Sequence, residues 1–269
     1  MAKASGLDDS LNDFEAKTYT FGGESKTVYR KGTGPAVVVI SEIPGITPLV
    51  ADFARRVVDI GCTVAMPSLF GVDGRRPTSG YIATSLAKAC VSRDFTTWTT
   101  GKSSPVVTWL RALSRDLHDE CGGPGVGAVG MCLTGGFALA MMLDDIMIAP
   151  VLSQPSTPFP VSKKHKADLA VSADELKIIK KRVDAGVCVL GLRFTGDPTS
   201  PGERFESLRR ELGDGFVGVE IDTSEGNAHG FKAKAHSVLT EELVDEPGNP
   251  THDALHQVLD LFKQKLLSA

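Results

Sequence analysis

The chain has 269 residues, a formal net charge of -4 and a pI near 5.9, with 42% hydrophobic and 23% charged residues. This composition is ordinary for a globular enzyme, and its acidic balance argues against a nucleic-acid-binding surface. No apolar run approaches the roughly 20 residues that a membrane-spanning helix needs, and the first nine residues lack the apolar core of a signal peptide. We therefore expect a cytoplasmic protein with neither a membrane nor a nucleic-acid partner.

Cysteine usage gives no indication of a disulfide framework or a zinc site. The cysteines are odd in number, widely spaced and without a C-x-x-C pair: Cys62, Cys90, Cys121, Cys132 and Cys188. We also find no internal repeat and no second domain, and the length fits one large α/β domain spanning residues 1–269.

The first half of the chain alternates between predicted strands and helices. Residues 17–30 predict an antiparallel hairpin with glycines in its turn, at the edge of a sheet. The β-branched run that ends at Ile40 is typical of a strand buried on both faces. Further on we expect a helix over 48–59, a strand over 62–66, an exposed loop over 71–80, helices over 82–93 and 104–121, and a strand over 126–130.

The second half continues the alternation. A strand is expected over 146–152, followed by a surface insertion over about 153–182 whose first part, 153–168, is rich in Pro, Ser and Lys. Capping boxes at Ser172 and Ser200 predict helices that end near Gly186 and Gly213. Strands over 187–194 and 216–221 and an amphipathic helix from Pro250 complete the pattern, which indicates a mainly parallel, doubly wound sheet with helices on both faces.

Val126–Ala140 contains the most informative segment, a strand, a glycine-bracketed turn with Cys132 at its apex, and a small-residue helix. In the related turn G-x-S-x-G, the nucleophile is raised above a parallel sheet and faces the amides that open the next helix. Thr134 stands where the second glycine is usual, and the glycines follow at 135 and 136. A buried structural cysteine is the alternative interpretation.

A thiol becomes an effective nucleophile when a histidine held by a carboxylate favours the thiolate. In α/β-hydrolase order, the acid follows a later strand and the histidine follows the last strand. Asp197 and His229 fill these places, and His236 is the close competitor for the second. As alternatives, Asp197 before Pro198 caps a turn, and His229 is an ordinary loop histidine.

The chain resembles the dienelactone hydrolase family, α/β-hydrolases with a cysteine nucleophile, from about Ala36 to the C-terminal helix. The resemblance rests on four segments: Ser41–Ile46, Gly130–Leu133, Gly196–Asp197 and Ala228–Phe231. It implies that Cys132 is the nucleophile, that His229 is the base and later the acid, and that Asp197 orients the histidine.

The resemblance also implies that Glu42 is an extra carboxylate that contacts the resting thiol, and that the backbone amides of Ile43 and Leu133 form the oxyanion hole. A carboxylate beside a thiol disfavours the thiolate until it takes up a proton or moves away. The alternative is that Glu42 only caps the helix that follows.

Members of the family bind a substrate carboxylate with two arginines. Arg93 lies where one is expected, whereas the segment after His229 has Lys232 and Lys234 and no arginine. The resemblance therefore implies hydrolysis of a small, anionic lactone or ester, of the carboxymethylenebutenolidase type, by a monomer or small homo-oligomer without a metal or cofactor. Two alternatives stay open: a cysteine-elbow enzyme of the glutamine-amidotransferase or DJ-1-like class, and a non-enzymatic metabolite-binding or redox-sensing protein that uses Cys132.

Overall fold

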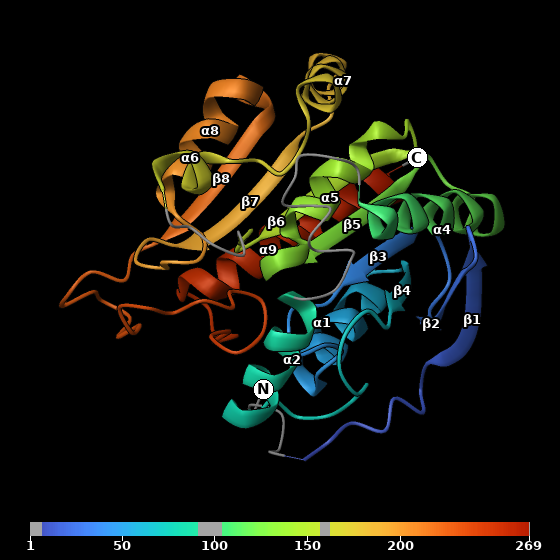
Figure 1. Cartoon of the computed structure of the whole chain (residues 1–269), viewed down its shortest axis with the longest axis horizontal. Coiled ribbons are helices and arrows are strands. Elements are labelled where there is room, and N and C mark those ends of the chain that lie inside the picture. Colours follow the sequence, from blue (N-terminus) through green and yellow to red (C-terminus); the bar gives the residue numbers. More distant parts are fainter. Residues whose placement is uncertain (1–6, 91–103, 157–161, 269) are drawn as a thin grey trace.

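A computed structural model describes residues 7–90, 104–156 and 162–268 of the chain, with the side chains of 88–90 left out. It contains an eight-stranded sheet in the order β1-β2-β4-β3-β5-β6-β7-β8 (Figure 1). The strands are β1 Glu15–Phe21, β2 Glu24–Lys31, β3 Ala36–Ile40, β4 Thr63–Pro67, β5 Val126–Met131, β6 Met147–Ser153, β7 Val189–Phe194 and β8 Phe216–Ile221. The pairs β1–β2 and β2–β4 are antiparallel, and every pair from β4 to β8 is parallel. The predicted edge hairpin and the mainly parallel sheet are both confirmed.

Helices connect the strands as the alternation predicts. The described helices are α1 Pro48–Asp59, α2 Ser79–Cys90, α4 Pro105–Cys121, α5 Gly135–Ala140, α6 Lys163–Ala167, α7 Ala173–Asp184, α8 Gly202–Leu212 and α9 Pro250–Phe262. Short 3-10 turns lie at Cys132–Thr134, Met141–Leu143 and Gly213–Gly215, and a π-helical turn, Lys263–Leu267, follows α9. Among the described residues, no helix is long and apolar enough to cross a membrane.

The sheet separates two apolar cores, because alternate residues of its central strands point to opposite faces. In β3, Ala36, Val38 and Ile40 pack into the core under α4, α5, α7 and α8, whereas Val37 and Val39 pack into the core under α1 and α9. All five of these side chains are buried. The apolar side predicted for the C-terminal helix is also buried, namely Leu255, Val258, Leu259, Phe262 and Leu266.

The topology gathers the loops of the site at one edge of the sheet. β3 lies between β4 and β5, so the connections that leave β3 and β5 run in opposite directions at this point of the strand order. Ligands of open α/β sheets bind at such switch points, outside the carboxyl ends of the strands. Glu42 follows β3, Cys132 follows β5, and Asp197 follows β7. The fold therefore brings three predicted site residues to the same edge.

Two local predictions are wrong. The stretch from Ser153 does not begin on the surface: Ser153, Gln154 and Ser156 are all buried, and the peptide N–H of Gln154 donates to the carbonyl of Leu192, which ties the stretch to β7. The capping box at Ser200 does not form, because Pro201 is the N-cap of α8 and no side chain caps it. The capping box at Ser172 does form, as predicted.

Candidate active site

The turn after β5 holds Cys132 in a backbone conformation that is rare for a residue with a side chain. Its φ is 57°, in the left-handed region, between the end of β5 and the short helix α5. Gly130 is required beneath it, since a Cβ there would lie 2.1 Å from the carbonyl oxygen of Thr134. The predicted strand, turn and helix around Cys132 are thus present, with the apex under strain.

Thr134 stands where a glycine is usual, and it fits the turn because its hydroxyl forms hydrogen bonds within it. The side chain is fully buried, accepts from the peptide N–H of Met131 at 2.8 Å and donates to the carbonyl of Ile40 at 2.9 Å. The close approach that needs a glycine occurs one residue later, where a Cβ on Gly135 would lie 2.7 Å from Pro155. The irregular spacing of the glycines therefore reflects where the neighbouring loop passes.

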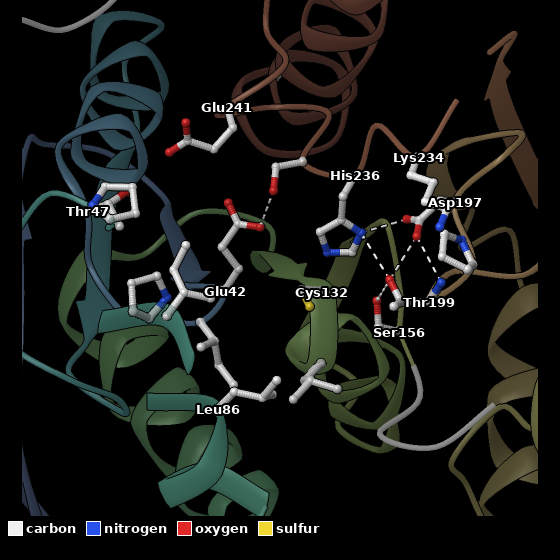
Figure 2. Close-up of a pocket in the computed structure, with 17 residues that line it drawn as sticks. Glu42, Thr47, Leu86, Cys132, Ser156, Asp197, Thr199, Lys234, His236 and Glu241 are labelled. Atoms are coloured by element: carbon white, nitrogen blue, oxygen red, sulfur yellow. Dashed lines mark hydrogen bonds and ion pairs between the residues drawn. The ribbon is translucent and has the colours of Figure 1, made fainter. Parts of the chain in front are cut away.

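The structure places His236, and not His229, against Asp197. The Nδ1 atom of His236 lies 2.6 Å from Oδ2 of Asp197, and Figure 2 shows the imidazole ring between that carboxylate and Cys132. The other oxygen, Oδ1, accepts from the backbone and the hydroxyl of Thr199 at 2.9 and 2.8 Å. Asp197 therefore caps its turn, as the alternative interpretation predicts, and contacts a histidine at the same time.

The path of the chain after β8 explains why the prediction of His229 is wrong. Phe231 packs on Phe194 with ring centroids 5.1 Å apart, and the chain then crosses the acid loop, where a Cβ on Gly196 would lie 2.2 Å from the carbonyl oxygen of Ala233. His229 precedes this crossing and is exposed, whereas His236 follows it. The sequence offered one clue: His236 opens a run, His-Ser-Val-Leu, that is apolar enough to be buried, while His229 stands among Gly and Asn.

The electrostatics of the pair favour a protonated histidine. Burial opposes the charge on His236, but the sulfur of Cys132 and the carboxylate of Asp197 outweigh it and hold the pKa of His236 well above its ordinary value of 6.5. Burial likewise opposes ionisation of Asp197, yet the hydrogen bond and charge of His236 keep the pKa of that carboxyl below its ordinary value. The arrangement can support an imidazolium beside a thiolate, which is the reactive form of a cysteine nucleophile.

Glu42 is buried and anchored by the segment that carries the histidine. Its carboxylate accepts from the hydroxyls of Ser237 and Thr240 at 2.6 and 2.5 Å and from the amide of Gln154 at 3.1 Å. Those are its hydrogen-bond partners among the described residues. The resemblance implied a contact between Glu42 and the thiol of Cys132, but the structure shows no hydrogen bond between the two. Nor does Glu42 cap α1, because Thr47 does so through the peptide N–H of Val50.

Gln154 and Ser156, which sequence reasoning missed, join the loops of the site to one another. Gln154 has a φ of 36°, and its side-chain oxygen accepts from the peptide N–H of Val238 at 3.3 Å. The peptide N–H of Ser156 donates to the carbonyl of Cys132 at 2.9 Å, and its hydroxyl lies 3.4 Å from that of Thr199. No motif marks these residues in the sequence, since each contact joins segments far apart in the chain.

A cavity of about 410 Å³ opens over Cys132 and His236. Its other described lining residues are Glu42, Ile43, Pro44, Thr47, Pro77, Ile82, Leu86, Leu133, Ser156, Asp197, Pro198, Thr199, Lys234, Ser237 and Glu241. Ile43 and Leu133, whose amides the resemblance implies as an oxyanion hole, both line this cavity. Lys232 and Lys234 are both exposed, and of the two only Lys234 lines the cavity. Arg93 lies outside the described residues.

A mainly parallel sheet with a nucleophile turn after β5, a carboxylate after β7 and a histidine after β8 defines the α/β-hydrolase class. The family model described as "Dienelactone hydrolase family" matches residues 23–266. The chain therefore belongs to the dienelactone hydrolase family and is a carboxylic ester hydrolase.

Solved structures agree on the fold. A dienelactone hydrolase from Anabaena variabilis ATCC 29413 is 14% identical, with a TM-score of 0.60, over 94% of this chain and 98% of that one. A dienelactone hydrolase-like promiscuous phosphotriesterase from metagenomic libraries is 16% identical, with a TM-score of 0.62, over 94% and 98%. Est1E from Butyrivibrio proteoclasticus is 11% identical, with a TM-score of 0.57, over 93% and 98%.

No protein of curated function matches the chain significantly. The family match and these structures do not support the two alternatives drawn from the sequence, the glutamine-amidotransferase or DJ-1-like class and the non-enzymatic binding or sensing protein.

Proposed function

We propose that the chain hydrolyses small, anionic lactones or esters through a Cys132-His236-Asp197 triad and an acyl-enzyme. The observation that carries this proposal is the 2.6 Å contact between Asp197 and His236, with the His236 ring beside Cys132 in the cavity. Glu42, by contrast, holds the segment after His236 through the hydroxyls of Ser237 and Thr240.

The chemistry follows from the roles that these groups can take. The Cys132 thiolate attacks the substrate carbonyl, and the backbone amides of Ile43 and Leu133 stabilise the oxyanion. His236 then gives its proton to the departing oxygen, which in a lactone stays tethered to the acyl group. A water molecule loses a proton to His236 and cleaves the thioester, which releases the carboxylic acid and restores Cys132. Asp197 keeps the imidazole oriented throughout.

The lining of the cavity supports an anionic substrate with an apolar body. Ile82, Leu86 and Leu133 supply apolar walls, and Lys234 is the single Lys or Arg among the described lining residues. Figure 2 places Lys234 on the Asp197 side and Glu241 on the opposite side, near Glu42. A substrate carboxylate is thus favoured at the Lys234 end of the cavity. Lys234 then takes the carboxylate-binding role that the sequence suggested for Lys232. Arg93 stays a predicted second contact of the carboxylate.

Trapping of the acyl-enzyme tests the mechanism. Wild-type protein quenched in acid during turnover of an activated ester should gain the mass of one acyl group, located on the peptide that contains Cys132. Cys132→Ala should show neither the adduct nor turnover above background. Turnover of the same ester by Cys132→Ala at the wild-type rate would exclude Cys132 as the nucleophile.

A matched pair of lysine variants tests the substrate class. Lys234→Ala should raise KM for a carboxylate-bearing ester by about two- to fivefold and leave the neutral analogue unchanged, because an ion pair to an exposed lysine contributes up to about 1 kcal/mol. Lys232→Ala changes a lysine of the same segment that does not line the cavity, and it should change neither value. Equal effects of Lys234→Ala on both esters would count against a carboxylate contact.

A further inference from the structure

A second cluster of ligating side chains lies outside the catalytic cavity, at the start of α9. Asp245 belongs to the stretch before this helix, and His252 and His256 lie one turn apart within it. One ligand atom from each of the three side chains can be chosen so that all lie within 4.8 Å of one another. None of the three lines the cavity over Cys132.

The side chains are already oriented toward each other. Nδ1 of His252 lies 2.8 Å from Oδ1 of Asp245, and the two imidazole rings have centroids 4.2 Å apart. Residues four apart on a helix face the same side, so the His-x-x-x-His spacing presents two ring nitrogens next to the carboxylate. Two imidazoles and a carboxylate suit Zn²⁺, Ni²⁺ or Cu²⁺ better than Mg²⁺ or Ca²⁺.

Arg56 of α1 prepares the carboxylate for this role. Its Nη1 donates to Oδ2 of Asp245 at 2.6 Å. The other carboxylate oxygen, Oδ1, faces Nδ1 of His252. Arg56 fixes its orientation as an outer partner of the kind that supports metal ligands.

We propose that Asp245, His252 and His256 bind a divalent transition-metal ion, with Zn²⁺ as the expected ion and solvent in the remaining position. A tetrahedral ion with bonds of about 2.0–2.2 Å holds neighbouring ligand atoms roughly 3.4 Å apart. His256 is exposed and can rotate to close the remaining distance. The ion ties the stretch before α9 to the helix itself, away from the ester-hydrolase site.

Zinc titration of the purified full-length chain tests this site. Calorimetry with ZnCl₂ should show one binding event that weakens at least about tenfold in His256→Ala and in His252→Ala. His229→Ala removes an exposed histidine elsewhere and should bind as the wild type does. Any zinc that binds at Cys132 does so in the wild type and in all three variants, so differences in zinc affinity between them report the α9 cluster alone.

A spectroscopic measurement identifies the ligands. Co²⁺ added to Cys132→Ser protein should give visible bands of a nitrogen and oxygen site without a thiolate charge-transfer band, and His256→Ala should lose them. Wild-type zinc affinity in both histidine variants, or cobalt bands that survive in His256→Ala, would overturn the proposal. Because neither readout uses ester hydrolysis, its failure is separate from any failure of the proposed function.

Discussion

The turn that carries Cys132 and the segment that carries His236 are built in opposite ways. The backbone shape of the turn depends on its own neighbours: Gly130 makes room for the carbonyl of Thr134, and the Thr134 hydroxyl binds Met131. Ile40 and Ser156 add contacts from elsewhere in the chain. The histidine segment is held by partners far away in the chain, since Glu42 lies 195 and 198 residues from the hydroxyls that it accepts from. The backbone shape of the Cys132 turn is therefore encoded locally, whereas the position of the histidine is a property of the whole fold.

The largest expected effect separates the two histidines. His236→Ala should lower kcat for an activated ester by about 10²–10⁴-fold, because it removes the group that accepts and returns the proton. His229→Ala should leave kcat unchanged, since its exposed ring lies before the crossing over the acid loop. Steady-state kinetics of both variants provide the test, and a loss confined to His229→Ala would restore the histidine first predicted from the sequence.

A smaller loss is expected when the local turn is broken by a single methyl group. Gly130→Ala places a Cβ 2.1 Å from a backbone oxygen, and we expect it to lower the free energy of unfolding by about 3 kcal/mol or more. Gly80 in α2 is the matched control, because a Cβ there meets nothing within 4 Å. Urea denaturation of the two variants gives the comparison, and equal stability would show that the turn is not tightly packed.

This contrast also explains how far the sequence could predict the molecule. β3, α1 and the nucleophile turn follow from hydrophobic period, caps and glycine spacing, all of which act over a few residues. Asp197 was predictable because it directly follows β7. His236 was predictable only as a competitor of His229, and Gln154 and Thr240 were not predictable. Their contacts depend on where the long stretch after β8 crosses the acid loop, a path set by Phe231 on Phe194 and by the space at Gly196.

The hydrogen bonds by which Glu42 holds the histidine segment can be removed without changing a residue of the triad. Glu42→Gln removes the charge that accepts from Ser237, Thr240 and Gln154, and should lower kcat about tenfold by loosening His236, at a cost to stability of about 1–2 kcal/mol. KM should change little. If positioning of His236 is the cause, the double variant Glu42→Gln and Ser237→Ala should have the same kcat as Glu42→Gln alone. Fully additive losses in kcat would instead assign Glu42 a separate role at the thiol.

The smallest expected effect is a pH dependence of stability that comes from the histidine segment. His236 has a folded-state pKa well above 6.5, so its contribution to stability is fully present below that value and is lost as the pH rises through the folded-state pKa. Urea denaturation should therefore show that His236→Gln is most destabilising near pH 6 and progressively less so toward alkaline pH. In a Cys132→Ser background the sulfur no longer raises the pKa of His236, and Asp197 alone still does. The stabilising contribution of His236 should therefore be lost at a lower pH than in the wild type. A destabilisation by His236→Gln that stays constant from pH 6 to alkaline pH would mean that the imidazole carries no extra proton in the folded protein.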